Sequence, residues 1–135
     1  MAKRIREKTA ARKANVDKRP RATATFVRIT PKKAGMVLDL VRGKKYEEAL
    51  AILTNINNAS SDVVKKLIVS AGSNEENNPK NSLGVPKEEL YVAECYANNG
   101  PILKRQSIRA RGRVDIIDKR TTHITVILDK KEVNK

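Results

Sequence analysis

The chain has 135 residues, enough for one domain and too few for two separate hydrophobic cores. Its 29 Lys and Arg outnumber 15 Asp and Glu, and the formal net charge of +14 indicates a polyanionic partner. Cys95 is the single cysteine, which excludes an internal disulfide and fits a reducing cytoplasm. No apolar run approaches the roughly 18 residues of a membrane span, so no membrane partner is expected.

The excess positive charge is concentrated in two segments. Residues 1–21 carry nine basic and two acidic side chains, residues 100–123 carry seven and two, and residues 22–99 carry ten and nine. We therefore expect a basic N-terminal extension at 1–21, a single α+β domain at 22–131 and a C-terminal tail at 132–135. The extension is poor in apolar side chains, which predicts a disordered or weakly helical tail, either a solvated one or a phosphate-binding arm.

The first half of the domain predicts a strand followed by helices. Ala22 to Ile29 alternates and contains β-formers, which is typical of a strand. Thr30-Pro31 then opens a helix, since Thr is a favoured N-cap and Pro a favoured first residue, and Gly43 is expected to end it as a left-handed cap. Apolar spacing at i, i+3, i+4 and i+7 marks this helix and a second one by the stripes Ala34, Val37, Leu38, Val41 and Tyr46, Ala49, Leu50, Leu53.

A third helix is predicted to begin with Ser60, Ser61 or Asp62 as its cap. Its apolar stripe ends at Ala71, and the helix is expected to fray into residues 75–79, with Glu75 and Glu76 as solvated surface. The first two helices are not expected to form a DNA-reading helix-turn-helix. The second carries Glu47 and Glu48 on its polar face, where a recognition helix needs basic or polar groups.

The second half predicts two strands joined by a long basic segment. Residues 89–97 and 123–128 have strand character, and a loop is expected at 80–87. β-Compatible residues continue inward from both strands, which favours a long hairpin at 99–122 over an ordinary basic loop. The fold class is therefore α+β: three helices packed on a small antiparallel three-stranded sheet, with a long protruding β-hairpin and a basic N-terminal tail.

The predicted hairpin has two legs of twelve residues, so at about 3.3 Å per residue it reaches roughly 40 Å. Its turn is expected at residues 109–113, where Gly112 can adopt positive φ and three arginines concentrate charge. Asp115 and Asp118 are expected to pair across the ribbon with Arg105 or Lys104. A two-stranded ribbon is marginal in water by itself, so this one should insert into a partner.

The residues available for catalysis or metal binding are few. His123 and Cys95 are the only histidine and cysteine, each lies in a strand pattern, and no third group is placed to orient them. A zinc site needs three or four such ligands. We expect no enzyme activity, no metal and no cofactor.

Arg and Lys are thus the groups left to recognise the partner. The four aromatic residues are Phe26, Tyr46, Tyr91 and Tyr96, and none is interleaved with the basic segments. A reader that stacks bases on aromatic side chains is therefore not expected. Phosphate contacts that recognise a folded RNA by shape are predicted instead.

Several motifs resemble the ribosomal protein L22 family of the large subunit. They run collinearly over about residues 24–129 as Arg28-Ile-Thr-Pro-Lys-Lys33, Val37-Leu-Asp-Leu-Val-Arg-Gly-Lys44, Ala49-Leu-Ala-Ile-Leu53, Gly100-Pro with Lys104-Arg105, Arg109-Ala-Arg-Gly-Arg113 and Lys119-Arg-Thr-Thr-His-Ile-Thr-Val126. Two features depart from the family: Ile108 stands where Pro is frequent, and residues 1–21 extend the usual start.

The resemblance implies a structural constituent of the cytoplasmic ribosome that binds large-subunit ribosomal RNA and supports subunit assembly. It further implies neighbouring ribosomal proteins as partners and a hairpin whose tip lines the peptide exit tunnel, with the nascent peptide as a candidate partner there. The RNA-binding residues implied by the matching motifs are Lys104, Arg105, Arg109, Arg111, Gly112, Arg113, Lys119, Arg120 and His123, together with Arg28, Lys32, Lys33, Arg42 and Lys44. Two alternatives are a free-standing RNA chaperone or translational regulator, and an RNA-modifying enzyme that depends on His123 or Cys95.

Overall fold

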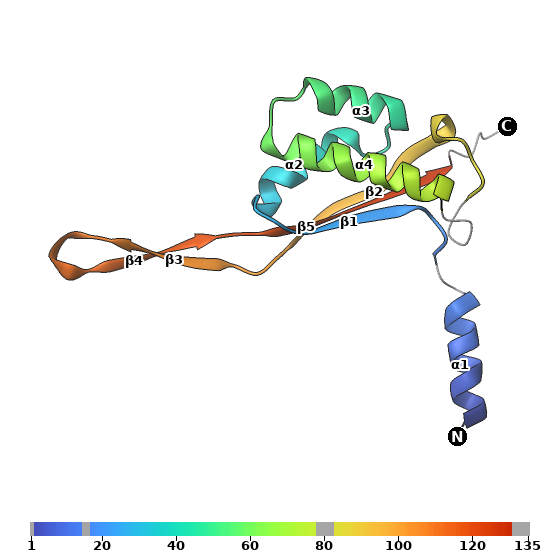
Figure 1. Ribbon diagram of the computed structural model, residues 1–135, viewed down its shortest axis with the longest axis horizontal. Coiled ribbons are helices and arrows are strands. Elements are labelled where there is room, and N and C mark those ends of the chain that lie inside the picture. The colour runs from blue at the N-terminus through green and yellow to red at the C-terminus, as the bar shows by residue number, and fades with distance from the viewer. Residues whose placement is uncertain (1, 15–16, 78–82, 131–135) are drawn as a thin grey trace.

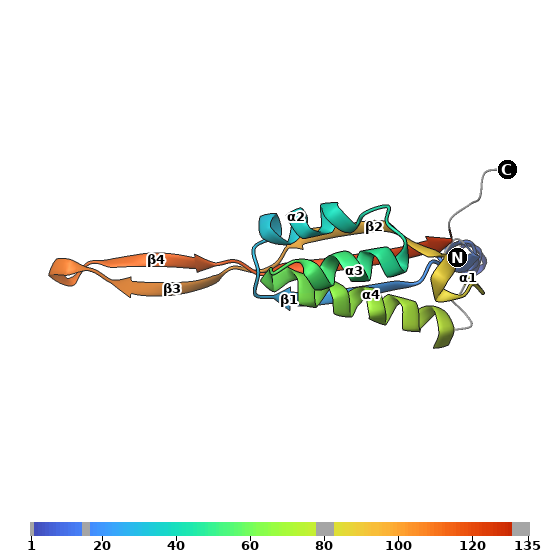
Figure 2. The same cartoon turned by 90° about the horizontal axis from the view of Figure 1, so that it is seen from above.

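Three helices cover one face of a three-stranded antiparallel sheet, and a hairpin projects from one end of that sheet (Figures 1 and 2). This computed structural model describes residues 2–14, 17–77 and 83–130, so the tail expected at 132–135 lies outside the described residues. The predicted α+β class is confirmed. The elements are α1 (Ala2–Ala14), β1 (Arg21–Val27), α2 (Pro31–Val41), α3 (Tyr46–Asn55), α4 (Ala59–Asn77), η1 (Lys87–Glu89), β2 (Leu90–Asn99), β3 (Leu103–Ile108), η2 (Ala110–Gly112), β4 (Val114–Lys119) and β5 (Thr122–Lys130).

The sheet has the order β1-β5-β2, so the last strand of the chain lies in the centre. Thr125 of β5 is opposite Thr23 on one side and Tyr96 on the other. Alternate residues of β5 are buried against the helices, namely Ile124, Val126 and Leu128. Helix α2 packs on β2, α4 packs on β1 and β5, and α3 packs mainly on α4. No helix of the described residues packs on the opposite face of the sheet (Figure 1).

The turn after α2 is tied to the sheet. Pro31 is at the start of α2 as predicted, but the Thr30 side chain makes no capping hydrogen bond. Helix α2 ends at Val41, and its C-cap residue, Arg42, has extended backbone angles. Gly43 follows in the predicted left-handed conformation, with φ of +75°, but its N–H donates to the Val92 carbonyl of β2 at 2.8 Å and not back to the helix. This hydrogen bond ties the turn after α2 to β2.

Helices α3 and α4 differ from expectation in two details. Leu53 is 2% exposed, whereas Leu50, predicted in the same buried stripe, is only half-buried. Asn58 caps α4, since its Oδ1 accepts the Ser60 N–H at 2.9 Å. Ser60 and Ser61, the predicted caps, are buried. The cap lies earlier because the first turn of α4 packs into the domain.

Helix α4 does not fray at residues 75–77 as predicted, and residues 78–79 lie outside the described part of the chain. The helix continues to Asn77, and Glu75 is 3% exposed. Its Oε1 accepts the N–H groups of Leu83 at 2.7 Å and Val85 at 3.3 Å. The prediction of Glu75 as solvated surface was therefore wrong, because the backbone N–H groups of residues 83 and 85 hydrogen-bond to this carboxylate.

The N-terminal extension contains a helix, α1, that leaves the domain at the end opposite the hairpin (Figure 1). All the described side chains of α1 are exposed, including Ile5 at 63%. Attachment to the sheet begins before residue 22: Arg19 forms ion pairs of 2.8 Å with Asp17 and with Glu94 of β2. The guanidinium of Arg19 lowers the pKa of Asp17.

Candidate nucleic-acid interface

The hairpin is a separate two-stranded sheet that continues β2 and β5. Pairing of those strands ends at Asn99 opposite Thr122, and pairing of β3 with β4 starts at Leu103 opposite Lys119. Each hairpin strand has six residues, fewer than the twelve of each predicted leg. Between the two sheets, the Gly100 N–H donates to the Thr121 carbonyl at 2.9 Å. We call residues 100–102 and 120–121 the junction.

The junction is closely packed around Thr121, which is 4% exposed. Its hydroxyl donates to the Pro101 carbonyl at 2.7 Å. A Cβ at Gly100 would meet the Thr121 hydroxyl and would lie 3.1 Å from the Thr121 carbonyl carbon. Glycine at position 100 therefore allows the two segments of the junction to approach each other where the hairpin leaves the domain.

The tip of the hairpin, residues 109–113, presents arginines to solvent. Arg111 and Gly112 both have positive φ, of 59° and 70°, and the Arg109 N–H donates to the Arg113 carbonyl at 2.8 Å. Asp115 pairs with Arg109 at 2.7 Å, not with Arg105 or Lys104 as predicted. The register explains the difference, because Ser107 is opposite Asp115 and Lys104 is opposite Asp118.

Exposed apolar side chains lie between these charges along the ribbon. Ile108 is 85% exposed and Ile116 is 67% exposed, and further exposed apolar groups are Ile102, Val114 and Ile117. An isolated ribbon with this much apolar surface in water is marginal, so it requires a surrounding partner. The tip charges indicate that the surroundings are anionic.

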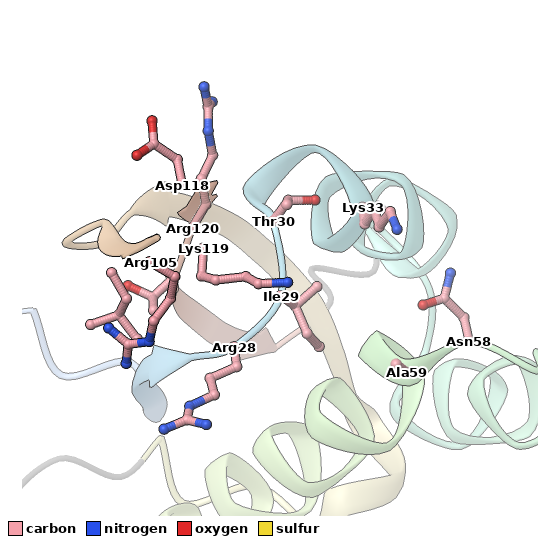
Figure 3. Close-up of a pocket in the computed structure, with 12 residues that line it drawn as sticks. Arg28, Ile29, Thr30, Lys33, Asn58, Ala59, Arg105, Asp118, Lys119 and Arg120 are labelled. Atoms are coloured by element: carbon pink, nitrogen blue, oxygen red, sulfur yellow. The ribbon is translucent and has the colours of Figure 1, made fainter. Parts of the chain in front are cut away.

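A cavity of about 500 Å³ lies where the hairpin meets the helices, and we call it the basic pocket (Figure 3). Its walls come from the segment between β1 and α2, the start of α4, and both strands at the base of the hairpin. The lining residues are Arg28, Ile29, Thr30, Lys33, Asn58, Ala59, Leu103, Arg105, Asp118, Lys119, Arg120 and Thr121.

Five cations and one carboxylate line the basic pocket, so its potential is positive. Lys119 extends across the pocket towards Ile29, and Lys33 lies on the side of α2 (Figure 3). Helices α2 and α4 both begin at this wall, and helix N-termini add partial positive charge. The basic pocket therefore suits an anion such as a phosphate group.

The fold brings together five of the predicted RNA-binding residues, Arg28, Lys33, Arg105, Lys119 and Arg120, in the basic pocket. Four others, Arg109, Arg111, Gly112 and Arg113, form the tip. Lys104 is exposed on β3, and Lys32 is exposed on the first turn of α2 outside the pocket lining.

Two predicted residues are engaged within the domain. Arg42 pairs with Asp39 at 2.7 Å and donates to the Cys95 carbonyl at 2.9 Å, which ties the end of α2 to β2. Lys44 pairs with Glu48 at 2.9 Å and lowers the pKa of that carboxyl. Their charges are therefore partly neutralised by the protein itself.

His123 lies in β5 on the uncovered face of the sheet, and its Nδ1 accepts the Phe26 N–H at 3.1 Å. Cys95 instead points into the core, where its Sγ donates to the Leu38 carbonyl at 3.3 Å and burial raises the pKa of its thiol. The two side chains lie on opposite faces of the sheet, so they form no nucleophile and base pair. Within the described ranges, no group of three or more His, Cys, Asp or Glu is arranged to hold a metal ion, and no helix is long and apolar enough to cross a bilayer.

Sequence reasoning missed the exposure of Phe26 and the polar wall residues Thr30 and Asn58. A signal for the wall was present, because both precede a predicted helix and helix starts attract anions. No comparable signal marked Phe26, which simple alternation places in the core.

Comparison with known proteins gives a consistent result. The profile of the family described as ribosomal protein L22p/L17e matches residues 22–129. A large ribosomal subunit protein uL22 from Desulforamulus reducens is 50% identical over 113 residues, 83% of this chain and 96% of the relative. The protein of that name from Agathobacter rectalis is 47% identical over 133 residues, 97% of this chain and 100% of the relative. The second match extends into the N-terminal extension, which lies outside the family profile.

Proposed function

Because the chain belongs to the ribosomal protein L22p/L17e family, whose members are structural proteins of the large ribosomal subunit and not enzymes, we propose that it binds large-subunit ribosomal RNA. It acts there by neutralising phosphates where RNA segments converge, and in this way it supports assembly of the subunit in the cytoplasm. Neighbouring ribosomal proteins are further partners.

The basic pocket is the observation that carries this proposal. Its cations come from segments far apart in the chain, from Arg28 to Arg120, and only the folded domain assembles them. None of these five side chains forms an ion pair with another described residue. Such a group of cations is unfavourable unless an anion enters it.

We further propose that the tip of the hairpin lines the peptide exit tunnel. The ribbon projects beyond the helical layer, so its tip lies far from the core (Figure 2). Arg111 and Arg113 have no ion pair among the residues described, and they are available to RNA or to nascent peptide. The apolar side chains of the ribbon suit an enclosed site.

The experiment that tests the proposal measures affinity for a large-subunit ribosomal RNA fragment as a function of salt. Each phosphate contact contributes about 0.7 to 0.9 to the slope of log K against log salt, so a pocket and tip that both engage predict a slope steeper than about −4. A slope near zero would contradict the proposal. A high-salt wash of large subunits separates it from the alternative of a free-standing RNA chaperone: a constituent stays in the particle, and a chaperone is released.

A further inference from the structure

Strand β1 contains a bulge that turns Phe26 away from the core. Ala24 is opposite Ile124 and Val27 is opposite Thr122, so β1 has one residue more than β5 over this interval. Ala24 and Val27 both pack against the core, whereas Phe26 between them is 61% exposed. Regular alternation from Ala24 would have buried Phe26.

The conformation of Phe26 is unfavourable for a bulky residue. Its φ of +57° lies in the left-handed region that glycine favours, and its ring is mostly in water. Backbone outliers of this kind persist where surrounding structure holds them, and they concentrate at functional sites. Exposure of the ring therefore calls for a partner that uses it.

His123 holds the ring and the bulge in place. Its Nδ1 accepts the Phe26 N–H at 3.1 Å, which supplies a hydrogen bond at the bulge. The two rings are edge to face, with centroids 5.0 Å apart and an interplanar angle of 87°. Since Nδ1 is the acceptor, the neutral imidazole carries its proton on Nε2. Nε2 makes no hydrogen bond to any described part of the chain and is available as a donor.

The surroundings of Phe26 favour RNA over a protein partner. Its other neighbours on the uncovered face are mostly polar, with Thr23, Thr125 and Asn98 beside a partly exposed Tyr96, so the face lacks a large apolar patch. Arg28, two residues after Phe26, lines the basic pocket, and so does Arg120, three residues before His123. Both strands that carry the Phe26 and His123 rings thus lead, within two or three residues, to the lining of the basic pocket.

We propose that Phe26 stacks an unpaired base of the RNA whose backbone enters the basic pocket, with His123 Nε2–H donating to that base or its sugar. This inference rests on the proposed function and adds a base-binding site to it. Aromatic side chains on an open sheet face stack bases in this way, and the contact tolerates any sequence because every base has a flat π-face.

The test compares Phe26→Leu and Phe26→Trp with the wild type in binding to a large-subunit ribosomal RNA fragment. Leu is also an apolar non-glycine residue and meets the same positive φ at position 26, but it has no flat ring on which a base can stack. The affinity for RNA therefore falls roughly 5- to 150-fold. The salt slope stays at the wild-type value, because no charge is lost. Leu40→Ala on α2, which truncates another exposed apolar residue, is the matched control and changes affinity less than twofold. Thermal melting establishes that each variant is folded.

Phe26→Trp keeps an aromatic face and introduces the only tryptophan of the chain. It binds within threefold of the wild type, and a stacked base quenches its fluorescence on addition of RNA. The stacking site is overturned if Phe26→Leu binds RNA with wild-type affinity or if RNA does not quench the emission of Phe26→Trp. A steep salt slope of the wild type would still support the proposed function in that case. A blue shift without quenching in assembled subunits, but not with RNA alone, assigns the face to a protein partner and also overturns it. If the wild type does not bind the RNA, the proposed function itself fails.

Discussion

Replacement of two pocket lysines should weaken RNA binding by a factor that depends on the salt concentration. Lys33 and Lys119 line opposite walls of the basic pocket and make no ion pair in the described chain. If each contacts one phosphate, the double variant Lys33→Gln and Lys119→Gln lowers the magnitude of the salt slope by about 1.4 to 1.8. Affinity then falls about 25- to 60-fold at 0.1 M salt and about threefold at 0.5 M.

The matched control replaces two lysines that the domain already engages. Lys87 pairs with Glu76 at 2.7 Å, and Lys65 donates to the Thr54 hydroxyl at 2.9 Å. The double variant Lys87→Gln and Lys65→Gln has the same net charge as the pocket variant but should change the slope by less than about 0.7, the contribution of one contact. Filter binding of a ribosomal RNA fragment between 0.1 and 0.5 M KCl measures both slopes. Equal slopes for the two variants would refute the assignment of the pocket, since only total charge would then matter.

Other predictions concern the stability of the domain. Leu53→Ala should destabilise the domain by about 2 to 5 kcal/mol in urea unfolding because Leu53 is buried, and Leu50→Ala should cost less because Leu50 is half-buried; equal costs would show that the core face is misplaced. Gly100→Ala forces a Cβ against Thr121 and should cost about 1 to 3 kcal/mol, visible as a lower melting temperature. Deletion of residues 103–118 should leave cooperative melting intact, and its loss would contradict a domain that folds without its hairpin. Cys95 should react with a thiol reagent only on unfolding, because burial of its side chain raises the pKa of the thiol; rapid labelling of the native protein would contradict this.

The helices and strands were predictable because their apolar spacing reflects one buried face. Ala34, Val37, Leu38 and Val41 are all buried, at the positions that a helical period of 3.6 residues requires. Leu50 departs because α3 packs mainly on α4 and only its inner edge reaches the sheet. Periodicity thus locates the buried face but not its width.

Features that depend on distant segments were not predictable. Glu75 belongs to an acidic pair and resembles solvated surface, but two backbone N–H groups from residues 83 and 85 reach it. The bulge at Phe26 needs His123, which is 97 residues away, to accept its N–H. The basic pocket likewise arises only when the base of the hairpin is placed beside the starts of α2 and α4. The local sequence pattern carries no information about these contacts between distant segments.

The central position of β5 has a consequence for biosynthesis. β1 and β2 do not pair with each other, so neither has a strand partner in this sheet until Thr122–Lys130 has been made. The hairpin precedes β5 in the chain and is therefore always complete before the sheet can close. A chain interrupted before residue 122 exposes unpaired strands and the apolar side of the helices, which are features that promote aggregation and degradation. In the natural sequence, the sheet therefore closes only after the whole hairpin has been synthesised.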